Sequence, residues 1–103
     1  MTAYKLPQDC RSLEDIRADV NRIDRELVAL LAERNGYALA ATAFKKSEAD
    51  IHAPDHLDAF FAERKRLARE AGLSEAMIER IFRAIVERTI EMQSAIWRSA
   101  HKS

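Results

Sequence analysis

One long amphipathic stretch, from Ser12 to Lys46, constrains the fold more than any other feature of the chain. Ser12 is followed three residues later by Asp15, a pattern typical of a helix N-terminus. Behind it, apolar residues recur at steps of three and four: Ile16, Val20, Ile23, Leu27, Leu30 and Leu31. This spacing predicts a single helix with an apolar stripe. At about 1.5 Å per residue the helix would be roughly 50 Å long, so it needs a partner along its length.

The rest of the chain predicts two further helices. Residues 1–11 show no periodicity and are interpreted as an N-terminal arm, and residues 46–53 are interpreted as a polar connecting loop. Pro54 suits the first turn of a second helix, which Gly72 would end, and Ser74 would cap a third. Because no strand pattern occurs, the sequence predicts a single all-α domain over residues 1–103, with one long, one short and one medium helix.

The lengths of these helices predict an oligomer. The two shorter helices cannot cover the whole long one, and a monomer would leave apolar surface in water at about 25 cal/mol per Å². We therefore expect an intertwined homodimer formed through the long helices, with a poorly folded isolated protomer.

Charge and cysteine content exclude several classes of function. Seventeen basic residues balance seventeen acidic ones, so we expect neither nucleic acid nor a membrane as a partner, and any anion site must be local. The single cysteine, Cys10, can form no internal disulfide, and we interpret it as an inert thiol in a reducing compartment. The sequence shows neither the apolar core of a signal peptide nor a run of 18 apolar residues, so a cytoplasmic location is expected.

Three cations on the long helix are candidates for binding an anion. At 100° per residue, Arg34 and Lys45 share a face about 16 Å apart along the axis, and together they could hold one small anion. Arg17 lies about 100° off that face, so in a dimer it would reach the pocket of the neighbouring protomer. A solvated face or a salt bridge remains the alternative for each residue.

Gln93 is unusual because it lies on the apolar stripe of the third helix, between Thr89 and Ile96. A buried amide without partners costs a few kcal/mol, so it should bond within the core or contact a ligand. The sequence leaves both possibilities open. Thr89 would lie beside it, one turn earlier.

Other kinds of site are not indicated. The sequence has no glycine-rich phosphate loop, no zinc-type Cys/His spacing and no nucleophile with a matching histidine and acid. His52 and His56 are separated by Pro54, so we expect an exposed pair rather than a metal site. We therefore expect no cofactor and no metal. The remaining cations, amide and hydroxyl suit a pocket that binds a dianion and stabilises a charge-separated transition state.

At these residues the chain resembles the all-helical chorismate mutases, over about Cys10 to Trp97. The segments that carry the resemblance are Asp15-Ile16-Arg17, Arg22-Ile23-Asp24, Leu30-Leu31-Ala32-Glu33-Arg34, Phe44-Lys45 and Gln93. Within the family the chain is most similar to the isochorismate-pyruvate lyase branch. The features of that branch are Asp9-Cys10, Phe44-Lys45, Ser47-Glu48-Ala49 and Ala53-Pro54.

The resemblance implies an intertwined dimer with two active sites. Arg17 would enter the partner's site, and Arg17 and Arg34 would hold the two carboxylates of the substrate. Lys45 and Gln93 would be the catalytic residues, because they would donate hydrogen bonds to the ether oxygen as the carbon–oxygen bond breaks. The loop at residues 46–53 is expected to close over the substrate.

Departures from the family pattern leave the reaction open. In the register where mutases have Asp, Arg and Glu, this chain has Ala53, His56 and Leu57, with His56 as a candidate substrate-binding residue. Leu57 resembles the lyase branch, whereas His56 replaces an arginine that the lyases keep. Thr89, also a candidate binding residue, resembles the mutases.

Three functions are compatible with these sequence features. The first interpretation is a chorismate mutase, which rearranges chorismate to prephenate. The second is an isochorismate-pyruvate lyase, and an aminated chorismate analogue is a further possible substrate. The third is a catalytically silent helical dimer that acts as a binding or regulatory module.

Overall fold

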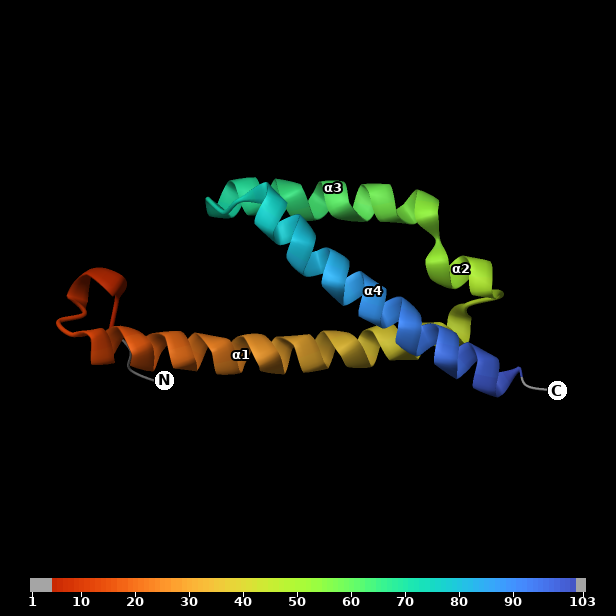
Figure 1. Cartoon of the computed structure of the whole chain (residues 1–103), viewed down its shortest axis with the longest axis horizontal. Coiled ribbons are helices and arrows are strands. Elements are labelled where there is room, and N and C mark those ends of the chain that lie inside the picture. Colours follow the sequence, from red (N-terminus) through yellow and green to blue (C-terminus); the bar gives the residue numbers. More distant parts are fainter. Residues whose placement is uncertain (1–4, 102–103) are drawn as a thin grey trace. The chain divides into compact units, whose positions relative to one another are not determined.

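The structure, a computed structural model, describes residues 5–101, without the side chains of Pro54 and Asp55. The elements in chain order are the 3₁₀ turn η1 (Pro7–Asp9), α1 (Leu13–Ala40), the 3₁₀ turn η2 (Ala41–Phe44), α2 (Glu48–His52), α3 (Pro54–Ala71) and α4 (Glu75–Ala100) (Figure 1). These residues include no strand, so the predicted all-helical class is confirmed. The chain divides into two compact units, Met1–Gly36 and Tyr37–Ser103.

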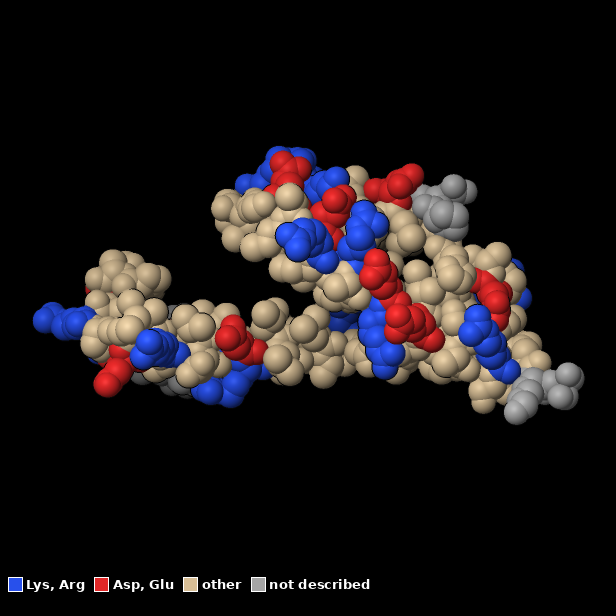
Figure 2. Space-filling model, in the orientation of Figure 1, with Lys and Arg blue, Asp and Glu red and all other residues tan. Residues whose placement is uncertain are grey.

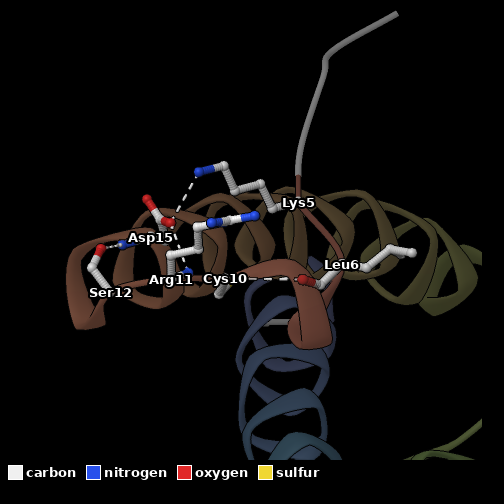
Figure 3. A network of polar contacts seen from close by, with 6 residues as sticks. All are labelled: Lys5, Leu6, Cys10, Arg11, Ser12 and Asp15. Carbon is white, nitrogen blue, oxygen red and sulfur yellow. Dashed lines mark hydrogen bonds and ion pairs between the residues drawn. The ribbon is translucent and has the colours of Figure 1, made fainter.

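The first unit begins with a hydrogen-bonded arm at the start of α1 (Figure 3). The predicted cap is present, because the Asp15 backbone N–H donates to Ser12 Oγ at 3.1 Å. The Asp15 carboxylate accepts from Lys5 Nζ at 2.9 Å and from the Arg11 backbone N–H at 3.0 Å. These donors, with the Arg11 bond as the larger cause, hold the pKa of Asp15 below its usual value of 3.8. The first turn of α1 is therefore tied to the arm by one carboxylate.

Cys10 lies in this arm and is half-buried. Its thiol donates to the Leu6 carbonyl at 3.6 Å, and partial burial raises its pKa. A raised pKa lowers the fraction of reactive thiolate, and the inert thiol stays a prediction.

The predicted apolar stripe of α1 is present, but within the chain it is not buried. The side chains of its six residues are between 40% and 61% exposed: Ile16, Val20, Ile23, Leu27, Leu30 and Leu31. No residue of α1 is buried. The helix therefore presents apolar surface that another surface would have to cover.

The long helix is shorter than predicted. The prediction that it continues to Lys46 is wrong, since α1 ends at Ala40 and η2 follows to Phe44. The tighter turn brings the Lys45 backbone N–H to the Thr42 carbonyl at 3.1 Å, and Lys45 itself is extended (φ −79°, ψ 140°). The change of helix type at Ala41 re-aims Lys45 relative to a continuous α-helix.

In the second unit, α3 and α4 run in roughly opposite directions, diverge from the turn that joins them, and pack against one another (Figure 1). The turn between them is as predicted, with Gly72 left-handed (φ 73°) and the Met77 backbone N–H donating to Ser74 Oγ at 3.1 Å. Phe61 and Ala68 are buried at 8% and 3% exposure. The core of this pair therefore lies between α3 and α4.

Residues 46–53, predicted to be a polar connecting loop, contain a short helix instead. Glu48–His52 forms the short helix α2, which packs against α4. Two features explain it: the Asp50 backbone N–H donates to Ser47 Oγ at 3.2 Å, and Ile51 is only 5% exposed. A single turn has no helical periodicity to read from sequence, so burial of one residue decides the structure.

Candidate active site

The structure places the six predicted site residues in two groups. Arg17, which is exposed, and Arg34, which is half-buried, lie on α1 in the first unit. Lys45, His56, Thr89 and Gln93 lie in the second unit: Lys45 directly after η2, His56 on α3, and Thr89 and Gln93 on α4.

Gln93 is held in one orientation by the end of α1. Its side chain is buried at 5% exposure, and Nε2 donates to the Ala38 carbonyl at 2.6 Å. The last carbonyls of a helix lack intrahelical donors, so this bond satisfies a group that the end of α1 leaves open. An amide nitrogen carries two hydrogens, and the second remains for another acceptor. The predicted core bond is thus confirmed, and a ligand contact stays a prediction.

Lys45 is held by α2. Its ammonium Nζ donates to the backbone carbonyl of Asp50 at 3.3 Å, and the side chain is half-buried. No ion pair of the described residues involves Lys45, so its charge faces a neutral carbonyl rather than a carboxylate. A cation in this state has donors and charge left for an anionic ligand.

A cavity of about 500 Å³ adjoins Lys45. Its lining is otherwise mostly apolar and comes from the end of α1, η2 and the end of α4, and it includes Leu39, Ile96 and Trp97. The Trp97 ring stacks on His101, with centroids 3.7 Å apart. A small apolar space with a single cation at its edge suits a compact organic anion.

The positions of Thr89 and His56 follow from the helices that carry them. Thr89 is half-buried on α4, one turn before Gln93, as predicted from its spacing. His56 is exposed in the first turn of α3, and so is His52 in α2. The described residues contain no group of three or more His, Cys, Asp or Glu side chains that could hold a metal ion.

Charges elsewhere on the second unit are largely balanced. Lys65 pairs with Glu79 at 2.9 Å and Arg69 with Glu75 at 2.8 Å, and both pairs join α3 to α4. On the face shown in Figure 2, basic and acidic atoms are interspersed over these two helices. An anion would therefore find no extended basic surface there, which leaves the local cation Lys45 as the better candidate.

Sequence reasoning missed Asp50, which bonds to the Ser47 cap of α2 and to Lys45. Its carboxylate accepts from the Lys46 backbone N–H at 2.9 Å, while its carbonyl accepts from Lys45. The signal was present as Ser47-Glu48-Ala49-Asp50, a hydroxyl followed three residues later by an acid, as at Ser12. It was overlooked because no apolar repeat follows it.

None of the helices within residues 5–101 combines the length and apolar character needed to cross a membrane.

Two comparisons with known proteins bear on this site. The family model for chorismate mutase type II matches residues 16–94. The chain is also 43% identical, over 94 residues, to a protein of Pseudomonas aeruginosa named isochorismate pyruvate lyase. That alignment covers 91% of this chain and 93% of the relative.

Proposed function

Because the chain belongs to the chorismate mutase type II family, we propose that it is an enzyme acting on a dianionic, chorismate-type substrate, and that its reaction is the cleavage of isochorismate to salicylate and pyruvate. The observation that carries this choice is the 43% identity to the Pseudomonas aeruginosa lyase across nearly the whole length of both chains. The sequence alone ranked the mutase first, and this relative reverses that order.

The proposed reaction needs no co-reactant. The ether carbon–oxygen bond to the ring breaks while one ring hydrogen moves to the methylene carbon of the enolpyruvyl group. That carbon becomes the methyl group of pyruvate, and the ring becomes the aromatic ring of salicylate. Negative charge grows on the ether oxygen as the bond breaks, so fixed donors there lower the barrier.

Lys45 and Gln93 are the proposed donors. Their support is that Gln93 is fixed by Ala38 with one amide hydrogen left, and that Lys45 is bonded to a neutral carbonyl. Donors that are fixed before the substrate binds are the most effective kind, and these two bonds support that role for Lys45 and Gln93. Arg17 and Arg34 are the proposed carboxylate ligands, with Thr89 and His56 beside the ring.

The chorismate mutase reaction is the second candidate, and Thr89 favours it. Thr89 is half-buried next to Gln93, and a small hydroxyl residue in this register resembles the mutases. Leu57 favours the lyase, because an apolar side chain replaces the glutamate that would bind the ring hydroxyl of chorismate.

We also propose that the active unit is a homodimer in which Arg17 serves the partner's site. The support is the exposed apolar stripe of α1, whose side chains are 40% to 61% exposed. Contiguous apolar surface of this kind on one helix face is typical of an interface.

A side-by-side assay tests the function. Purified protein is given isochorismate and chorismate in parallel, and salicylate, pyruvate and prephenate are followed. We expect a higher kcat/KM with isochorismate, and Lys45→Ala to lower kcat by about 10²–10³-fold. Lys46→Ala is the matched control, since its side chain is exposed.

Preference for chorismate would establish the mutase instead. Turnover of neither substrate, with no shift in melting temperature on adding either, would favour the silent binding module.

A further inference from the structure

The short helix α2 packs against α4. A helix of five residues is not stable alone, so its position depends on what it touches. Besides the Ser47 cap and the buried Ile51, an ion pair ties it to α4: Arg98 Nε donates to Glu48 Oε1 at 3.0 Å. The two residues are 50 positions apart in sequence. This pair therefore fixes the beginning of α2 to the end of α4.

The same helix carries the groups that hold Lys45. The Asp50 carbonyl accepts from Lys45 Nζ at 3.3 Å, and the Asp50 carboxylate accepts from the Lys46 backbone N–H at 2.9 Å. Asp50 is two residues beyond Glu48 within one helical turn, so movement of α2 away from α4 would carry both acceptors with it. Any change in the docking of α2 is thereby passed to the ammonium of Lys45.

We propose that the ion pair between Glu48 and Arg98 positions Lys45 for the reaction, by holding α2 and the Asp50 carbonyl against α4. Neither residue is proposed to contact the substrate, and the inference rests on the proposed function only in giving Lys45 a role there. The pair is exposed, with 44% and 69% of the two side chains accessible, so it adds little to global stability. Its expected effect is local, because a helix of five residues depends on its tertiary contacts for its position.

The chain offers a closely matched control. Arg88 pairs with Glu91 on the same helix at 3.1 Å, and its side chain is 68% exposed, nearly as much as that of Arg98. Both partners lie on α4, so this pair has no link to α2. Arg98→Gln and Arg88→Gln thus remove the same charge from the same helix, and only the first breaks the tie to α2.

The experiment combines kinetics with hydrogen exchange. We expect Arg98→Gln to lower kcat by about 3- to 30-fold, because small misplacements of a catalytic group are costly, with KM changed less. Amide exchange across residues 47–53 of the substrate-free protein should rise at least about threefold as α2 opens more often. Arg88→Gln should leave both quantities near wild type. The charge-reversed double variant, Glu48→Arg with Arg98→Glu, should restore both to within about threefold.

Other results would overturn the proposal. If Arg98→Gln behaves like Arg88→Gln, the pair does not dock α2. If exchange rises while kcat is unchanged in an active enzyme, α2 docking does not position Lys45.

Failure of the proposed function is recognised separately. Should the wild-type protein turn over neither substrate, the NMR resonance of the Lys45 side-chain Cε reports its surroundings directly. A shift in Arg98→Gln, absent in Arg88→Gln, supports positioning, and an unchanged resonance contradicts it.

Discussion

At the scale of single residues, Gln93 combines a structural bond with a free donor. Its amide donates to the Ala38 carbonyl at 2.6 Å, and the residue is only 5% exposed. Sequence reasoning located this residue because an amide on an apolar stripe needs a partner. It could not name Ala38, since a main-chain carbonyl 55 residues away leaves no mark in the sequence.

Replacement of Gln93 by methionine tests the structural bond. Gln93→Met keeps the length of the side chain but leaves the Ala38 carbonyl unpaired, so the free energy of unfolding should fall by about 1–3 kcal/mol. Chemical denaturation measures this loss. Met92→Leu, a volume-conserving change one residue earlier, should cost less. An equal loss in both variants would show that the hydrogen bond contributes nothing particular.

Asp15 gives a prediction on pH. Its lowered pKa means that the folded protein binds this proton less tightly than the unfolded chain does. The resulting stabilisation is present above about pH 4, near the unfolded value, and is lost as pH falls through the lower folded pKa. The melting temperature of wild type should therefore exceed that of Asp15→Asn at pH 7, and the difference should shrink towards pH 3. A difference independent of pH would argue against the charge of Asp15 as its cause.

At the scale of elements, helix boundaries with a local chemical cause were predictable. Ser12 and Ser74 cap α1 and α4, Pro54 starts α3, and Gly72 ends it, all as the sequence indicated. The elements that were missed are η2, for which no side-chain cap is present, and α2, whose Ser47 cap is followed by only one turn of helix. Their form depends on packing against α4, which the sequence pattern does not contain.

The two glycines should respond oppositely to the same substitution. Gly72 is left-handed with φ 73°, so Gly72→Ala should destabilise the protein by about 1 kcal/mol. Gly36 lies inside α1, with nothing within 4 Å of the position where a Cβ would be, so Gly36→Ala should stabilise it by about 0.5–1 kcal/mol. Thermal unfolding measured by circular dichroism gives both signs. Destabilisation by Gly36→Ala would mean that another surface approaches α1 there in the assembly.

At the scale of the whole molecule, the most important feature is the exposed apolar stripe of α1. Periodicity predicted the stripe and its apolar character, and the structure has both. Periodicity identifies an apolar face, but it does not identify the surface that packs against this face.

A charge placed on the stripe tests the homodimer. Ile23 is 49% exposed within the chain, and a glutamate there would be buried in the proposed interface without a partner. We expect Ile23→Glu to shift the protein to monomers in sedimentation at micromolar concentration, with loss of helical content. Arg25→Glu, which adds the same side chain on the opposite face of α1, should stay dimeric. Monomeric wild-type protein would rule out the interface.

Mixing two inactive variants tests whether sites are shared. Arg17→Ala and Lys45→Ala should each lower activity by about 10²-fold or more on their own. After equal mixing and refolding, half of the dimers are mixed, and each has one site with both residues intact. Activity should therefore recover to about a quarter of wild type. If mixing restores nothing although mixed dimers form, Arg17 does not serve the partner's site.

The bond between Gln93 and Ala38 also has an evolutionary consequence. Since the acceptor is a peptide carbonyl, every amino acid at position 38 supplies it equally, provided that the helix persists. Position 38 can therefore drift without a compensating change at position 93. In a library randomised at both positions, the set of residues selected at 93 should be the same whichever small residue occupies 38.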